Sequence, residues 1–141
     1  MYRTIGVTLV ELMVAVLIVS LLAVVAIPSL TGRVDASKWS EAKQGMGLIA
    51  SALRTYAVEE GDFSTPPTLA QIAIRESDLD GTHFSHDAYV ITSASASGRR
   101  VSFTITCTAA DSTRPGAPTK PAVMTLACDL ANSYTPTFSV P

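Results

Sequence analysis

One acidic residue, Glu11, lies inside an otherwise apolar stretch near the N-terminus of this 141-residue chain. The stretch from Val7 to Leu30 reads VTLVELMVAVLIVSLLAVVAIPSL, and its other polar side chains are hydroxyl groups. A charged residue at the centre of a hydrocarbon layer costs about 2.5 to 3.5 kcal/mol and usually has a partner. Glu11 therefore either lies at the level of the lipid headgroups, where it needs no special partner, or pairs with a positive group.

Two cysteines, Cys107 and Cys128, lie in the C-terminal part of the chain. If that part is exported, an even number of cysteines favours a disulfide over two buried free thiols. Their spacing matches neither the paired-cysteine pattern of structural zinc nor a haem attachment motif. We therefore expect a disulfide between Cys107 and Cys128, and no metal at these residues.

A polar segment contains the other side chains that could bind a metal: Asp78, Asp80, His83, His86 and Asp87. The DLDG stretch that begins at Asp78 superficially suggests a calcium loop, but the further oxygens and the closing glutamate of an EF-hand are missing. We expect an Asx-type turn there, while calcium binding by Asp78 and Asp80 stays open. The histidines and Asp87 could contribute to a metal site, yet nothing in the sequence completes one, so none is predicted.

Motifs for catalysis and for nucleic-acid binding are missing from the sequence. It has no GxSxG, no HExxH and no phosphate-binding glycine loop, and no base accompanies its serines and threonines at a recognisable spacing. The net charge is −2, and Arg99 with Arg100 is the only adjacent basic pair. Nucleic acid is therefore not an expected partner. We predict a protein that is not an enzyme and needs no cofactor.

The apolar stretch is long enough to cross a membrane. Its 24 residues would reach roughly 36 Å as a helix, and the hydrocarbon core of a bilayer measures about 30 Å. About 110 residues then remain, which is the size of one small globular domain. A competing interpretation is a secretory signal with an apolar core from Leu12 to Ala26, cleaved after Ala26 to release a soluble domain.

The sequence GVTLVEL, which begins at Gly6, and the apolar run that closes at Pro28 resemble the prepilin signal of type IV pilins and pseudopilins. The resemblance covers about the first 30 residues. In that family a prepilin peptidase cleaves after the glycine and methylates the new amino terminus. The resemblance implies a leader over residues 1–6 and a mature chain whose first residue is Val7 and whose fifth is Glu11.

The resemblance also implies a function. Residues 7–30 would hold the subunit in the bacterial inner membrane and then pack with identical or related subunits in a filament. Glu11 would pair with the terminal amine of a neighbouring subunit, which neutralises its charge in the apolar filament core. The predicted protein is a structural subunit of a type IV pilus-like filament at the cell surface, put together by the pilus or secretion assembly machinery.

Two alternatives to a pilus subunit stay open. One is a pseudopilin of a type II secretion system, in a filament that spans the periplasm. The other is a membrane-anchored periplasmic domain that never polymerises. Within the family, a C-terminal disulfide is more typical of pilins, whereas the major pseudopilins tend to hold that region with calcium. The expected disulfide therefore favours the pilus.

The helix should change character after the membrane span. Pro28 lacks an amide donor and clashes with the preceding turn, so it should kink the helix. Apolar residues at spacings of three and four then predict an amphipathic helix over about residues 33–59, which stops at Gly61. Gly45 and Gly47 weaken this helix by roughly 1 kcal/mol each relative to alanine, and they would allow close packing against a neighbour.

The globular domain, residues 31–141, should continue with a loop over residues 61–87 and a sheet over about 88–140. The strand candidates are Ala88–Ala94, Arg100–Ala109 and Ala122–Leu130, and the tail Tyr134–Pro141 could add an edge strand. Alternation places Cys107 and Cys128 among the apolar residues of their strands, and we expect them opposite each other in an antiparallel pair. The predicted fold is α+β and pilin-like: a long kinked helix, half membrane-spanning and half amphipathic, packed on a small antiparallel sheet of three or four strands.

Overall fold

The structure, a computed structural model, describes residues 6–98 and 100–141, apart from the side chains of residues 27–31. The chain divides into two compact units, Met1–Val34 and Asp35–Pro141. The predicted leader, except for Gly6, lies outside the described residues. Helix α1, Leu9–Glu60, is the longest element and contributes to both units.

In the first unit, α1 begins with a strongly apolar segment that contains only two polar side chains, Glu11 and Ser20. Residues Leu9–Ala26 form the one segment of the described chain that is a helix long and apolar enough to cross a membrane, and none of its 18 residues is buried. The helix assignment continues through Pro28, whose side chain is outside the described part. The predicted kink therefore stays a prediction.

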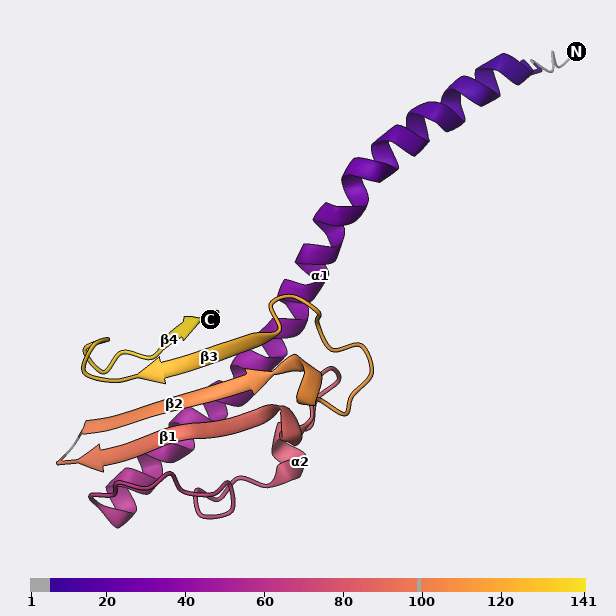
Figure 1. Ribbon diagram of the computed structural model, residues 1–141. Coiled ribbons are helices and arrows are strands. Elements are labelled where there is room, and N and C mark those ends of the chain that lie inside the picture. Colours follow the sequence, from indigo (N-terminus) through magenta and orange to yellow (C-terminus); the bar gives the residue numbers. More distant parts are fainter. Residues whose placement is uncertain (1–5, 99) are drawn as a thin grey trace, which may run out of the picture. The chain divides into compact units, whose positions relative to one another are not determined.

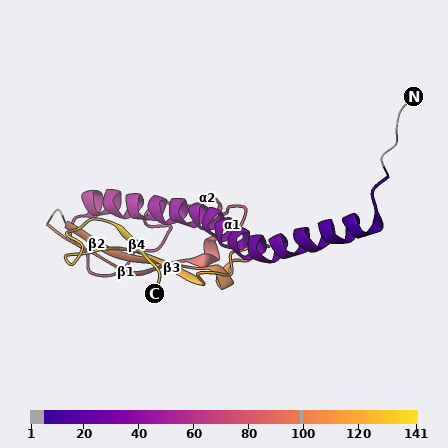
Figure 2. The same ribbon diagram turned by 90° about the horizontal axis from the view of Figure 1, so that it is seen from above.

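In the second unit, α1 covers one face of a four-stranded antiparallel sheet (Figures 1 and 2). The strands, in spatial and chain order, are β1 Tyr89–Ser97, β2 Arg100–Thr108, β3 Val123–Cys128 and β4 Thr137–Ser139. A four-residue helix, α2 Glu76–Leu79, and two 3-10 turns, His86–Ala88 and Ala109–Asp111, lie in the connections. The α+β class and the three predicted strands are confirmed, and the tail adds the short edge strand β4.

The amphipathic pattern explains how the helix packs on the sheet. The residues that α1 buries recur every three or four positions: Trp39, Ala42, Met46, Ile49, Ala50 and Leu53. The sheet buries the alternating residues of β2 and β3: Phe103, Ile105, Cys107, Met124, Leu126 and Cys128. The helix ends at Glu60, and Gly61 follows with φ 83°, a left-handed conformation that glycine adopts without strain.

The predicted register between β2 and β3 is wrong, and so is the predicted disulfide. Cys107 lies opposite Met124, and Cys128 lies opposite Phe103. The two cysteines are therefore four positions apart along the strand pair, about 13 Å, whereas a disulfide requires Cα atoms within about 7 Å. Both thiols are free and buried. An even shift in register leaves every side chain on its own face, so alternation alone could not reveal the error.

Candidate functional site

The two residues predicted to be processed lie just before helix α1. Gly6 and Val7 are in the non-helical segment that precedes Leu9, and both are exposed. Exposed backbone outside regular structure is where peptidases most readily reach a peptide bond. The bond between Gly6 and Val7 therefore lies in exposed backbone outside the helix.

Glu11 has a hydrogen-bonding partner within its own chain. Its Oε2 accepts hydrogen bonds from the Thr8 N–H at 3.0 Å and from the Thr8 hydroxyl at 2.9 Å. The Glu11 N–H in turn donates to Thr8 Oγ1 at 3.3 Å. This reciprocal arrangement is a capping box, which satisfies two of the unpaired N–H groups at the start of a helix. The spacing of a threonine and a glutamate three residues later is its sequence signature, and we did not predict the cap from it.

The capping box does not depend on the leader. Cleavage between Gly6 and Val7 leaves the Thr8 amide intact, because the new terminal amine forms at Val7. The second carboxylate oxygen of Glu11, Oε1, makes no hydrogen bond to the part of the chain that the structure describes. Glu11 thus keeps one oxygen for a further partner.

The apolar side chains around Glu11 are exposed in the described part of the first unit. Large exposed examples are Val7, Leu9, Leu12, Met13, Val16 and Leu17. Soluble proteins rarely expose a continuous apolar surface of this kind, which marks a membrane or an interaction site. An exposed apolar helix of this length fits a segment that is surrounded by lipid or by other apolar helices.

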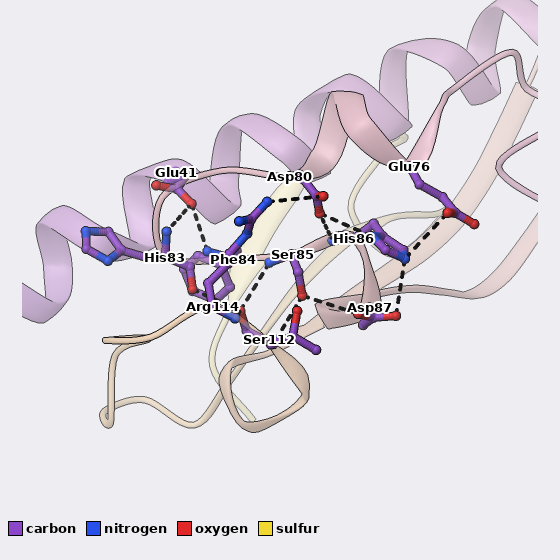
Figure 3. A network of polar contacts seen from close by, with 11 residues as sticks. Glu41, Glu76, Asp80, His83, Phe84, Ser85, His86, Asp87, Ser112 and Arg114 are labelled. Carbon is purple, nitrogen blue, oxygen red and sulfur yellow. Dashed lines mark hydrogen bonds and ion pairs between the residues drawn. The ribbon is translucent and has the colours of Figure 1, made fainter.

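A second candidate site is a polar network that joins the loops beside α1 (Figure 3). Glu41, on α1, accepts hydrogen bonds from the N–H groups of His83 and Phe84, both at 2.9 Å. The Glu41 carboxylate also lies against Gly81, where it leaves no space for a Cβ atom. The helix thereby holds the loop that follows α2.

Within this network, three carboxylates surround His86 (Figure 3). The ring atom Nδ1 is 3.1 Å from Asp80 Oδ1, and Nε2 is 3.3 Å from Asp87 Oδ1 and 3.7 Å from Glu76 Oε2. The hydrogen bond to Asp80 raises the pKa of His86. The hydrogen bonds from the backbone and the ring of His86 lower the pKa of Asp80, which also pairs with Arg114 at 3.2 Å.

The sequence candidates in this region are only partly brought together. Asp80, His86 and Asp87 are in contact, but His83 points away from them (Figure 3). The Asx-type turn expected at Asp78 is instead the short helix α2, and Asp78 Oδ2 accepts a hydrogen bond from the Arg75 N–H at 3.1 Å. Across the described residues, no group of three or more His, Cys, Asp or Glu side chains is arranged to hold a metal ion.

Ser112 connects the same network to the loop after β2. Its hydroxyl accepts a hydrogen bond from the Ser85 N–H at 3.1 Å and donates one to the His83 carbonyl at 3.0 Å. The Thr113 N–H donates to Ser85 Oγ at 3.0 Å. Sequence reasoning missed these contacts because the partners are 27 to 29 positions apart. The network, which we call the clasp, connects the loop after α2 to the loop after β2. The prediction that the protein is not an enzyme stays a prediction.

The two cysteines occupy different environments. Burial, followed by the charge of Asp111, raises the pKa of Cys107 to about 12, so this thiol stays neutral and unreactive at ordinary pH. The Cys128 thiol donates a hydrogen bond to the carbonyl of Tyr134 at 3.3 Å, and a guanidinium nitrogen of Arg54 lies 3.9 Å from its sulfur. Each thiol serves as a small core side chain in this domain.

Comparison with known proteins gives no match: no protein-family model fits the chain, and no similar protein is found among curated proteins or solved structures. The functional argument therefore starts from the residues and the geometry described above.

Proposed function

We propose that this chain is a structural subunit of a type IV pilus-like filament, held in the inner membrane by the first part of α1 and polymerised through that helix. The observation that carries the proposal is the segment Leu9–Ala26: it is apolar except for Glu11 and Ser20, begins within the GVTLVEL motif, and continues as the helix that packs on the sheet. One helix thus serves an apolar environment and a water-soluble domain.

Processing after Gly6 prepares the subunit for assembly. A prepilin peptidase would release the leader and leave a positive amine on Val7. In the filament, Glu11 Oε1 of one subunit would accept a hydrogen bond from the Val7 amine of a neighbour, while Oε2 stays in the capping box with Thr8. A carboxylate with both oxygens occupied is far less costly in an apolar core than an unpaired one.

Head-to-tail addition of identical subunits without closure gives an open helical assembly. The apolar helices would form the centre, and the sheet domain with its loops would form the outer surface. The partners are identical or related subunits, the peptidase and the assembly machinery in the membrane. Neither a cofactor nor nucleic acid takes part.

The free cysteines change the choice between the two filament classes. The expected disulfide was the feature that favoured a pilus over a secretion pseudopilus, and Cys107 and Cys128 form none. We therefore propose the assembly of subunits through the apolar helix, which both classes of filament share. The filament is either a type IV pilus or the pseudopilus of a type II secretion system.

The test begins with the N-terminal residue and the intact mass of protein extracted from bacterial membranes. A start at N-methylated Val7 is expected. A start at Met1 would indicate an anchored domain that does not polymerise, and a start near Ile27 would indicate a secreted domain; either result would overturn the proposal.

Filament assembly is tested by substitution at Glu11. Glu11→Leu subunits should enter filaments poorly, because the helix then offers no partner to the neighbouring amine. Val10→Leu, a substitution at an adjacent apolar position, is the matched control and should assemble normally. Equal assembly of the two variants would contradict the pairing role of Glu11.

A further inference from the structure

Two guanidinium groups line one recess in the second unit. Arg54, on α1, and Arg100, at the start of β2, border a cavity of about 290 Å³. Its other walls are Val58, Val101, Cys128 and Tyr134. The end of α1, the β1–β2 hairpin and the β3–β4 connection lie together at this end of the sheet in both views (Figures 1 and 2). Segments far apart in the chain therefore build the recess.

Each guanidinium is positioned by an aromatic ring. The Arg54 Cζ atom lies 5.6 Å from the ring centre of Phe103, and the Arg100 Cζ atom lies 5.7 Å from the ring centre of Tyr134. Within the described chain, neither group forms an ion pair with a carboxylate. Because a guanidinium that packs against a ring keeps its N–H edges free, both side chains retain donors for an anion.

Tyr134, whose ring packs against Arg100, has an unusual backbone conformation. Ser133 and Tyr134 have φ values of 52° and 58°, the left-handed region that residues other than glycine rarely adopt. The Tyr134 N–H donates to the Asp129 carbonyl at 2.7 Å, and its carbonyl accepts from the Cys128 thiol at 3.3 Å. Such strain tends to be retained where it positions a functional group.

A second recess, of about 440 Å³, adjoins the first and shares Val58, Arg100 and Val101 with it. Its remaining walls are mainly small and apolar, and Val58 is 86% exposed between the two recesses. Among the described residues, Asp62 is the only carboxylate that lines either recess, and it accepts a hydrogen bond from the Gly98 N–H at 2.7 Å. The surface thus has two free cations beside an uncovered aliphatic strip.

We propose that the two recesses together form a binding site for a carboxylate carried on a short aliphatic body. Arg54 and Arg100 hold the carboxylate, because the planar guanidinium fork matches its two oxygens. The aliphatic body lies along Val58 and Val101 and covers them from water. The ligand is thus a short-chain fatty acid or an acidic side chain beside an aliphatic one in a peptide. The site lies within the second unit and does not depend on filament assembly.

The experiment uses the full chain in phosphatidylcholine nanodiscs, titrated with acetate, butyrate and inorganic phosphate, with the arginine side-chain N–H signals followed by NMR. Butyrate should bind about five- to tenfold more tightly than acetate, since it buries two additional methylene groups in part. Phosphate, which lacks an apolar body, should bind less tightly than butyrate. Equal affinity for the three anions, or no binding of butyrate, would overturn the proposal.

Substitution then tests the two cations. Arg54→Met and Arg100→Met should each weaken butyrate binding at least tenfold, because each removes a charge-assisted contact. Lys43→Met is the matched control: Lys43 also lies over a ring, 5.5 Å from the centre of Phe138, but it lines neither recess. Unchanged affinity in the two arginine variants, or an equal loss in the control, would refute the site.

Two further measurements complete the test. Arg54→Lys keeps the charge and the packing stem, so it should fold like the parent and bind butyrate with intermediate affinity; emission from Trp39, buried in the core, reports folding in every variant. A capped Val-Glu dipeptide distinguishes the two ligand sources. Tighter binding of the dipeptide than of butyrate assigns the site to a polypeptide segment, and the reverse order assigns it to a free acid.

Discussion

Two glycines of the same helix should respond in opposite ways to the same substitution. Gly45 and Gly47 both lie in the part of α1 that belongs to the second unit. A Cβ atom at Gly45 would lie 2.7 Å from the Tyr89 hydroxyl oxygen and 2.8 Å from Cζ of the same ring. A Cβ atom at Gly47 would meet nothing within 4 Å. Gly45 therefore allows the close packing that the sequence suggested, and it does so against the domain's own sheet.

The size of the effect follows from two opposing terms. Alanine is favoured over glycine in a helix by about 1 kcal/mol, which applies to both positions. At Gly45 the added methyl group displaces Tyr89, which is 6% exposed and packs 6.3 Å from Phe84, and such overpacking costs about 1 to 3 kcal/mol. Gly47→Ala should raise the free energy of unfolding by about 1 kcal/mol. The free energy of unfolding of Gly45→Ala should be about 1 to 3 kcal/mol lower than that of Gly47→Ala.

Urea denaturation of the full chain in detergent, followed by tryptophan emission, measures the difference. Trp39 is the only tryptophan in the sequence and is 1% exposed, so its emission reports the opening of this core. In a Tyr89→Leu background the ring is gone, and Gly45→Ala should then become as stabilising as Gly47→Ala. If Gly45→Ala equals or exceeds Gly47→Ala in the parent chain, the close contact with Tyr89 is refuted.

Three further predictions concern the clasp and the thiols. Glu41→Ala should lower the free energy of unfolding by about 2 to 4 kcal/mol in the same assay, because two loop N–H groups lose a charged acceptor, whereas Glu41→Gln should lose less; equal losses would show that charge is unimportant there. The pKa of Asp80 is lowered from 3.8 and that of His86 is raised from 6.5 by their hydrogen bonds. The stability that they contribute is therefore lost as the pH falls below about 3.8 through the lowered pKa, and as it rises above about 6.5 through the raised one. A plot of Tm against pH for the parent and for His86→Gln should differ most between these limits, and parallel curves would contradict the pair. Reductant should leave the intact mass unchanged, and Cys107 and Cys128 should react with thiol reagents only after unfolding. A gain of two hydrogens on reduction would show that the two cysteines do form a disulfide.

The sequence predicted the features that depend on local periodicity. The apolar run of α1, its amphipathic continuation and the three longer strands all follow from spacings within one segment. Register does not, because moving β3 by four residues against β2 keeps Cys107 and Cys128 on their faces. The disulfide prediction failed for the same reason.

The candidate sites were predictable to different degrees. The processing role of Gly6 and Val7 rests on a motif and stays a prediction, whereas the contact of Thr8 with Glu11 was readable from its spacing of three. The contacts of Glu41 with residues 42 and 43 positions away, by contrast, have no local signal. The same holds for the recess of Arg54 and Arg100, since its walls come from α1, β2, β3 and the segment after β3.

Without a disulfide, the small domain must hold its long loops by other means. A domain of about 100 residues buries a limited fraction of its surface, so covalent or polar connections contribute much of its order. Here the connections are carboxylates that accept hydrogen bonds from the backbone N–H groups of distant segments. Asp35 accepts hydrogen bonds from the N–H groups of Thr119 and Lys120 at 3.4 and 3.2 Å. Glu41 likewise accepts hydrogen bonds from N–H groups of the loop after α2.

Both of these carboxylates come from the helix that also carries the apolar segment. α1 therefore supplies one face of the core through Trp39 and its neighbours and anchors two loops through Asp35 and Glu41. Any change that unwinds this part of α1 would release the core and both loops together. The sheet domain should consequently unfold as one unit.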